Sequence, residues 1–188
     1  GKEDFQIPYG IIVCTMRNHS EEQNLAMLKC AREYLGEGVC ALDLAGDESA
    51  YPTAQYRNIF REAKRLGIPY TIHSGETGNL DNVREAWELG AARIGHGIAL
   101  KKDPELMKSY AKAGIGVEMC PTSNFQTKAV QTWQDYPLRQ FLDARIKVSV
   151  NTANRTVSGT TMPRQLTTVD DQDGRDEARI LPYHRNVR

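Results

Sequence analysis

Short apolar stretches alternate with longer amphipathic stretches along this chain of 188 residues. The apolar stretches are rich in aliphatic and β-branched residues, which is typical of strands buried in a parallel sheet. They cover residues 11–15, 38–45, 68–73, 92–96, 115–120 and 146–151. The stretches between them repeat apolar residues with the period of a helix and cover 21–35, 53–67, 80–90, 103–114 and 136–146. This alternation predicts parallel strands joined by right-handed helical crossovers.

A polar cluster follows each predicted strand. The clusters read MRNHS, DLAGDE, HSGETGN, GHG, CPTSN and NTANR. A (β/α) barrel enzyme collects its chemistry at the carboxyl ends of all its strands. An open doubly wound sheet instead concentrates it at one switch point, usually with a glycine-rich loop after the first strand. No such loop follows residue 15, so the pattern favours an α/β fold of the (β/α)8 TIM-barrel type.

Six βα units are too few to close a barrel, which needs eight strands and about 250 residues. We therefore expect residues 1–162 to form an incomplete barrel of about six units. Such a sheet leaves two strand edges unpaired and exposes apolar surface, which predicts self-association or binding to a complementing N-terminal segment. From residue 163 the sequence is strongly charged, loses helical periodicity and contains Pro163 and Pro182. We expect residues 163–188 to be an atypical, disordered tail.

Charge and composition exclude several classes of partner. Lys plus Arg and Asp plus Glu number 24 each, so the formal net charge is zero and no long-range field gathers nucleic acid or an anionic membrane. No apolar run approaches the roughly 20 residues of a membrane span, and the first residues lack the order of a signal peptide. We expect a cytoplasmic protein. The four cysteines form no Cys-x-x-Cys pair and lie mostly in apolar stretches, which predicts buried thiols.

His73 and Glu76 follow the third predicted strand. A neutral imidazole at a strand end is a good zinc ligand, and a partly desolvated carboxylic acid nearby can hold a proton near neutral pH and deliver it to a substrate nitrogen. A structural alternative is equally consistent with this stretch alone. In that alternative His73 bonds a loop carbonyl and Glu76 caps the next helix.

His96 and the loop DLAGDE are the next candidates. Glycines on both sides of His96 leave its imidazole free, which suits a base or an orienting group, although a lone histidine is more often structural. Neighbouring parallel strands lie only about 4.8 Å apart, which brings His73 and His96 together. In DLAGDE, Gly46 would admit a ligand against the main chain while Asp43 and Asp47 fix the loop. The alternative is an acidic, solvated turn.

Together these phrases resemble the adenosine deaminase family, particularly its bacterial members. DLAGDE, HSGE, RIGHG, CPTSN and VNT followed by NRTVS occur in order and at workable spacing within residues 10–162. The resemblance implies a (β/α)8 barrel with one zinc ion that converts adenosine and water to inosine and ammonia in purine salvage. Zinc would lower the pKa of a bound water to about 7.

The resemblance also implies a role for individual residues. His73 is similar to a histidine zinc ligand, and Glu76 to the glutamic acid that protonates the purine ring nitrogen N1. His96 resembles the histidine that orients or deprotonates the zinc-bound water. Gly46 is similar to the glycine whose amide meets ring nitrogen N3, and Asn154 occupies a position where relatives have an asparagine or an aspartate that contacts the purine.

Two departures from the family pattern affect the metal ligands. The family has a His-x-His pair, which this sequence lacks, and an aspartate ligand where this chain has Ala153. Only His73 of four expected ligands is present, and a catalytic zinc site needs at least three protein ligands. We therefore expect impaired deaminase activity from this chain alone. The alternatives are a catalytically inactive protein that binds purines or acts as a scaffold, and an adenine deaminase.

Overall fold

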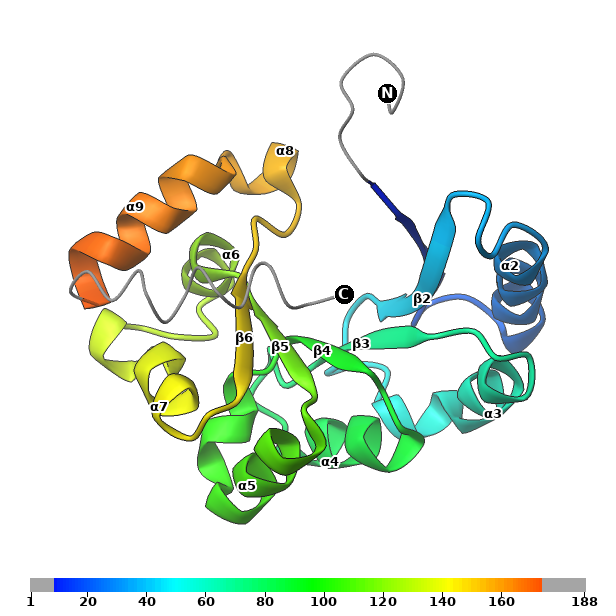
Figure 1. Ribbon diagram of the computed structural model, residues 1–188, viewed down its shortest axis with the longest axis horizontal. Helices are drawn as coiled ribbons and strands as arrows, with labels where there is room; N and C mark the ends of the chain where they lie inside the picture. Colours follow the sequence, from blue (N-terminus) through cyan, green and yellow to red (C-terminus); the bar gives the residue numbers. More distant parts are fainter. Residues whose placement is uncertain (1–8, 174–188) are drawn as a thin grey trace.

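Six parallel strands form one sheet in the computed structural model, which describes residues 9–173 (Figure 1). The strand order β1-β2-β3-β4-β5-β6 follows the chain, and each neighbouring pair is parallel. The strands are β1 (Ile11–Met16), β2 (Val39–Ala45), β3 (Tyr70–Ser74), β4 (Arg93–His96), β5 (Gly116–Met119) and β6 (Lys147–Val150). All six predicted strands are confirmed, and β1 and β6 form the edges of the described sheet.

Helices connect the strands and surround the outer side of the curved sheet (Figure 1). The connecting helices are α2 (Glu21–Glu33), α3 (Arg57–Arg65), α4 (Leu80–Leu89), α5 (Pro104–Ala113) and α7 (Leu138–Asp143). Shorter elements are the 3-10 helices η1 (Thr53–Tyr56), η2 (Ile98–Lys102) and η3 (Trp133–Asp135), with α6 (Pro121–Gln126) and α8 (Arg155–Ser158). The last described helix is α9 (Met162–Asp173). No helix within residues 9–173 is long and apolar enough to cross a membrane.

Local sequence signals set the helix ends. Ser20 and Gln23 form a capping box at the start of α2. Asp103 accepts hydrogen bonds at the start of α5, directly before Pro104. Gly90 and Gly114 end α4 and α5 in the left-handed conformation, which glycine adopts at little cost.

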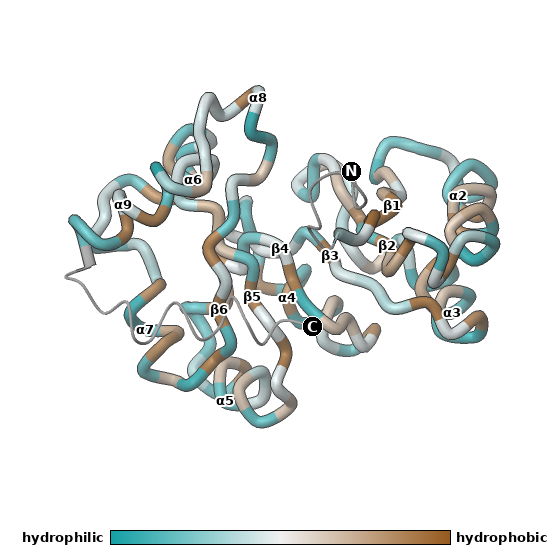
Figure 2. The backbone as a smooth tube through the Cα atoms, turned by 45° about the horizontal axis from the view of Figure 1, so that its top comes forward, coloured by the Kyte–Doolittle hydropathy of each residue, from teal (hydrophilic) through white to brown (hydrophobic). Residues whose placement is uncertain are grey.

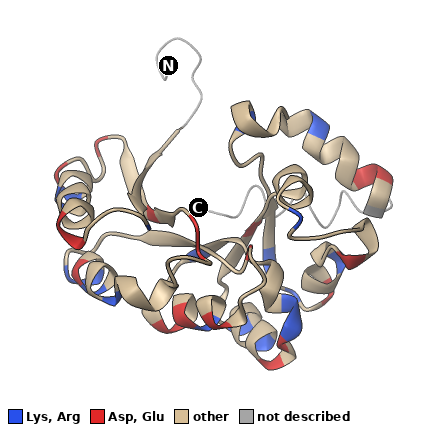
Figure 3. Ribbon diagram, turned by 180° about the vertical axis from the view of Figure 1, so that it is seen from behind, with Lys and Arg blue, Asp and Glu red and all other residues tan. Residues whose placement is uncertain are grey.

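The hydrophobic core lies between the sheet and the connecting helices. Strand residues such as Leu42, Ile72 and Ile94 are completely buried, and Phe60 of α3 packs on Tyr70 with ring centroids 4.8 Å apart. Figure 2 shows hydrophobic colouring on parts of the strands and hydrophilic colouring on much of the outer helices. Charged residues of both signs are mixed along these helices (Figure 3). The core thus fixes the strand ends that carry the candidate site.

The predicted loss of helical structure after residue 163 is wrong for the described part of that segment. Residues 162–173 form α9, whose Gln165 and Val169 are completely buried. Thr122 of α6 donates its hydroxyl to Gln165 Oε1 at 2.9 Å. Pro163 is compatible with the helix because it lies in the first turn, where its missing N–H has no intrahelical partner. The rest of the predicted tail, 174–188, lies outside the described residues.

The prediction of buried thiols is correct only for Cys120. Cys14, Cys30 and Cys40 are exposed. Cys14 lies on the edge strand β1, whereas Cys30 lies on α2 at the outside of the fold. Apolar sequence neighbours did not place Cys14 and Cys30 in the core, because an edge strand and an outer helix both present residues to solvent, and Cys40 lies exposed near the start of β2.

Candidate active site

His73 and His96 lie at the carboxyl ends of the neighbouring strands β3 and β4. Their rings lie 5.2 Å apart between centroids, because the register pairs His73 with Gly95 and Ser74 with His96. A Cβ atom at Gly95 would lie 3.2 Å from His73 Cγ, so glycine at this position leaves room for the His73 ring. The expected proximity of the two histidines is therefore observed in the structure.

The His73 ring is oriented by Asp43 of strand β2. His73 Nδ1 lies 2.8 Å from Asp43 Oδ2, and the carboxylate is almost completely buried. Burial disfavours the imidazolium, but the carboxylates of Asp43, Glu76 and Glu118, with Asp43 contributing most, together outweigh this effect and raise the pKa of His73 above its usual value. Asp43 thus engages Nδ1 and leaves Nε2 as the nitrogen available to a ligand, an arrangement typical of metal-binding histidines.

Glu76 contacts the second histidine. Its Oε2 lies 3.5 Å from His96 Nε2, and its Oε1 accepts a hydrogen bond of 3.2 Å from Thr127 Oγ1. Burial raises the pKa of Glu76 above its usual value. The alternative that Glu76 caps the next helix is wrong, since the side chain of Asn79 caps α4. His73, Glu76 and His96 therefore form one cluster.

The loop that carries Glu76 is held by the buried carboxylate of Glu48. Glu48 accepts hydrogen bonds from the main-chain N–H groups of Gly75 at 2.8 Å and Thr77 at 2.6 Å, on either side of Glu76. The amide of Asn82 donates to the same carboxylate. Sequence reasoning placed Glu48 in an acidic loop without assigning it this contact, because its partners lie 27 or more positions along the chain.

His96 lies in a strained and buried position. Its φ angle is +62°, in the left-handed region that non-glycine residues seldom adopt, and 4 % of the residue is exposed. Asn124 Nδ2 lies 2.9 Å from His96 Nδ1, and the Tyr136 hydroxyl donates to Asn124 Oδ1 at 3.4 Å. Burial, together with the nearby His73 charge, lowers the pKa of His96 to about 3. Sequence reasoning missed Asn124 and Tyr136, although Asn124 ends the phrase CPTSN.

Gly46 packs against Arg17. Its φ angle is +111°, and a Cβ atom there would lie 3.3 Å from Arg17 Cβ, so the position favours glycine. The Arg17 side chain is buried and donates to the main-chain oxygens of His73 at 2.7 Å and Tyr51 at 2.6 Å. Sequence reasoning missed these hydrogen bonds of Arg17, and the one to His73 connects the end of β1 to the end of β3.

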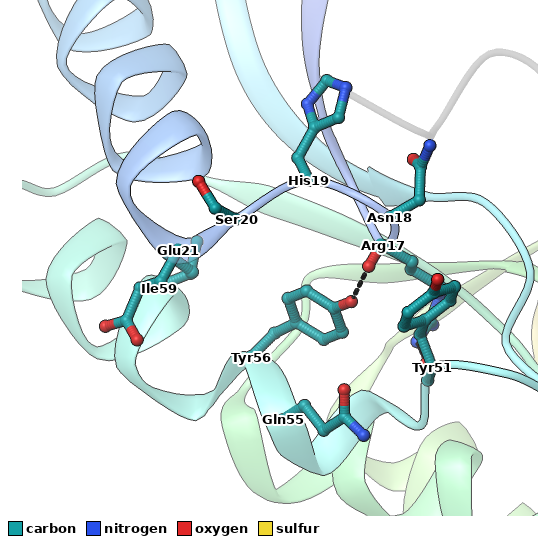
Figure 4. Close-up of a pocket in the computed structure, with 9 residues that line it drawn as sticks. All are labelled: Arg17, Asn18, His19, Ser20, Glu21, Tyr51, Gln55, Tyr56 and Ile59. Carbon is teal, nitrogen blue, oxygen red and sulfur yellow. Dashed lines mark hydrogen bonds between the residues drawn. The ribbon is translucent and has the colours of Figure 1, made fainter.

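A hollow of about 350 Å³ lies beside Arg17, at the start of α2 (Figure 4). The Tyr56 hydroxyl points at the main-chain oxygen of Arg17 and donates a hydrogen bond to it. The hollow is lined by Arg17, Asn18, His19, Ser20, Glu21, Tyr51, Gln55, Tyr56 and Ile59. None of the clustered residues His73, Glu76 and His96 lines it.

Ala153 and Asn154 follow the edge strand β6. Ala153 has a φ angle of +52°, and the Asn154 side-chain oxygen accepts a hydrogen bond from the Val157 N–H at 3.1 Å, capping α8. Among residues 9–173, no hydrogen bond or ion pair joins Gly46 or Asn154 to His73, Glu76 or His96. The structure therefore assembles three of the predicted site residues and places the other two outside their contacts.

The described residues do not complete a zinc site. His73 fits one ligand position, with Asp43 behind its other nitrogen. Within residues 9–173, no group of three or more His, Cys, Asp and Glu side chains could hold a metal ion. Ala153 offers no side-chain donor at the position where the family resemblance implies a ligand. A catalytic zinc needs three protein ligands, which this part of the chain does not supply.

Comparison with known proteins identifies the family. The adenosine deaminase family model matches residues 1–187. The adenosine deaminase of Enterococcus faecalis is 42 % identical over 166 residues, which is 88 % of this chain and 49 % of that protein. The adenosine deaminase of Clostridium kluyveri is 37 % identical over 163 residues, covering 86 % of this chain and 47 % of that protein. The chain thus spans about half the length of the curated relatives it matches.

Solved structures confirm the fold. An adenine deaminase from Arthrobacter aurescens matches with a TM-score of 0.81 at 24 % identity, over 91 % of this chain and 52 % of that one. An amidohydrolase from Burkhoderia ambifaria with bound zinc matches with a TM-score of 0.84 at 23 % identity, over 95 % of this chain and 50 % of that one. The six-stranded sheet corresponds to about half of a TIM-barrel amidohydrolase. The chain belongs to the adenosine deaminase family.

Proposed function

We propose that this chain supplies part of the active site of an adenosine deaminase, which converts adenosine and water to inosine and ammonia. The observation that carries the proposal is the cluster at the ends of β3 and β4, in which Glu76 Oε2 lies 3.5 Å from His96 Nε2 beside the His73 ring. The identity of 42 % to the adenosine deaminase of Enterococcus faecalis supports the same reaction. The purine nucleoside would bind at this carboxyl end of the sheet, in a cytoplasmic salvage reaction.

Glu76 is the proposed general acid. Its raised pKa lets a larger fraction of the side chain carry a proton near neutral pH than an ordinary glutamate would. Glu48 fixes the main chain on both sides of it, at Gly75 and Thr77. The protonated carboxyl would donate to a ring nitrogen of the purine, which makes the amino-bearing carbon more electrophilic.

His73 is the proposed metal ligand of this chain. The neighbouring amidohydrolase structure with bound zinc supports zinc as the metal. Because the described residues hold only this one ligand, we propose that two histidine ligands come from a complementing N-terminal segment, and that the unpaired edge of β1 receives it. Gly46 and Asn154 remain proposed contacts of the purine nucleoside. The N-terminal segment would complete the pocket and so determine whether the bound substrate touches them.

Two other functions have a specific observation in their favour. Ala153 at the expected ligand position favours a protein that binds a purine without turnover. The structural match to an adenine deaminase favours adenine as the substrate. Structures of Arabidopsis ADAL with IMP and with GMP also match this fold, which supports a purine ligand in general.

The experiment is a single-chain fusion of the N-terminal half of the Enterococcus faecalis enzyme to this chain. We expect the fusion to bind zinc and to release inosine from adenosine, and Ala153→Asp to increase both zinc content and turnover. Glu76→Gln is the matched control, which should abolish turnover and leave zinc content unchanged. A folded fusion that holds zinc and does not deaminate adenosine, with or without Ala153→Asp, would contradict the proposal.

A further inference from the structure

Asn124 holds His96 on the side that faces away from Glu76. The Asn124 side chain is completely buried, and its Nδ2 lies 2.9 Å from His96 Nδ1. The Tyr136 hydroxyl donates to the other end of the amide, at Asn124 Oδ1. The Asn124 main chain is fixed as well, because its N–H donates to Cys120 O at 2.9 Å and its carbonyl accepts from the Val130 N–H at 3.3 Å.

The chemistry of these contacts selects one form of the His96 ring. An amide nitrogen can donate hydrogen bonds but cannot accept them, so His96 Nδ1 must be the acceptor. A neutral imidazole with an accepting Nδ1 carries its hydrogen on Nε2. On the opposite side of the ring, Nε2 lies 3.5 Å from Glu76 Oε2, an oxygen that can accept this hydrogen. Both ring nitrogens therefore face a group of the matching type.

We propose that Asn124 is a positioning residue that fixes His96 as the neutral tautomer with its hydrogen on Nε2, and that Tyr136 sets the orientation of the Asn124 amide. Rings of ordinary exposed histidines exchange between tautomers. A buried ring that is held by an amide on one side and faces a carboxyl on the other has no such freedom, because the opposite tautomer would place two donors against each other at Nδ1.

This inference deepens the proposed deaminase function and rests on it for its catalytic meaning. The family resemblance leaves open whether the histidine at position 96 orients the attacking oxygen or removes a proton from it. With its hydrogen on Nε2, the ring presents a donor toward Glu76 and has no free lone pair there. His96 would therefore orient an oxygen nucleophile by donating to it, and would not act as the base through Nε2.

Asn124→Asp is the variant that reverses the direction of the hydrogen bond at His96 Nδ1. A carboxylate accepts hydrogen bonds and donates none when ionised, so it requires a hydrogen on His96 Nδ1. We expect this variant to hold His96 either as the Nδ1–H tautomer or as the doubly protonated imidazolium. Ser123→Ala, the preceding position on α6, is the matched control and should leave the tautomer unchanged.

The experiment is long-range proton–nitrogen NMR at neutral pH on the full chain with ¹⁵N-labelled histidine. The chain has four histidines, and the signal lost in His96→Gln assigns His96. We expect the Nε2–H tautomer to be at least about tenfold more populated than the Nδ1–H tautomer in the wild-type chain, because one buried hydrogen bond contributes about that factor. A hydrogen on Nδ1 in the wild-type chain, or an unchanged Nε2–H tautomer in folded Asn124→Asp, would overturn the proposal.

The wild-type spectrum tests the tautomer even if Asn124→Asp does not fold. In that case Tyr136→Phe provides the second variant, in which we expect the preference for Nε2–H to weaken because the amide loses one of its restraints. The measurement needs no substrate and no turnover. An unexpected tautomer would not change the result expected from the deaminase fusion. An inactive fusion would likewise not change the tautomer assignment.

Discussion

His73 and His96 lie at the carboxyl ends of neighbouring strands with their ring centroids 5.2 Å apart, and their surroundings shift their pKa values in opposite directions. Burial disfavours the charged form of both rings. At His73 the carboxylate of Asp43 lies 2.8 Å from Nδ1 and raises the pKa. At His96 the uncharged amide of Asn124 lies 2.9 Å from Nδ1, and burial together with the nearby His73 charge lowers the pKa to about 3. A carboxylate beside Nδ1 thus counteracts burial at His73, and within residues 9–173 no carboxylate lies beside Nδ1 of His96.

The largest expected effect comes from crowding the core directly after His96. In Gly97→Val a Cβ atom would lie 2.6 Å from Val117 Cγ1, at a φ angle of +65°. We expect the free energy of unfolding to fall by about 3 kcal/mol, because the overlap adds to the left-handed strain. Gly36→Val is the matched control, since its φ angle is +89° and nothing lies within 4 Å of the added Cβ. Urea unfolding that shows equal losses for the two variants would contradict this expectation.

Asp43→Asn should remove the difference in charge between the two histidines. The pKa of His73 is raised in the folded chain, so the Asp43 contact stabilises the fold below the ordinary histidine pKa of about 6.5 and loses this effect as the pH rises through the folded value. We expect the variant to lose about 1.5 kcal/mol near pH 5.5. Urea unfolding at several pH values measures the loss, and a loss that grows with rising pH would argue against this role of Asp43.

Tyr136→Phe should weaken the Asn124 contact with a smaller cost. The hydrogen bond to Asn124 Oδ1 is long, at 3.4 Å, so we expect a loss of about 0.5 to 1 kcal/mol in the free energy of unfolding. Thermal unfolding followed by circular dichroism measures it. A loss as large as that of Gly97→Val would mean that the hydroxyl has a structural role beyond orienting the amide.

Glu76→Gln should produce the smallest change and is expected to stabilise the chain. Burial raises the folded pKa of Glu76, so the folded chain keeps a proton that the unfolded chain releases above about pH 4.3. The contribution of Glu76 to stability is therefore present below that pH and is lost as the pH rises through the folded pKa. We expect the variant to be slightly more stable than the wild type at pH 7 and equal to it near pH 4. A variant that is less stable at pH 7 would contradict the assigned burial effect.

Periodicity and local signals were sufficient to predict the sheet, because each strand carries a short apolar run and each crossover helix carries an amphipathic one. The predicted proximity of His73 and His96 also followed from sequence, since parallel strands place their carboxyl ends at one edge. The helix α9 was missed because its two buried side chains, Gln165 and Val169, give too weak an apolar pattern.

The supporting contacts of the site could not be predicted in the same way. Glu48, in the loop after β2, accepts hydrogen bonds from Gly75 and Thr77 in the loop after β3. Asn124 contacts His96, which lies 28 positions earlier in the chain. Hydrophobic patterning does not report which buried polar side chains pair over such separations. The hydrogen bonds of Arg17 to His73 on β3 and to Tyr51 in the loop before η1 could not be predicted for the same reason.

The most direct test is to measure zinc content by mass spectrometry and adenosine deamination on the same purified sample of this chain. The cluster of His73, Glu76 and His96 lacks two of the three protein ligands that a catalytic zinc needs. We therefore expect well under one zinc per chain and no inosine above background. One zinc per chain together with inosine formation would contradict our description of this site as incomplete.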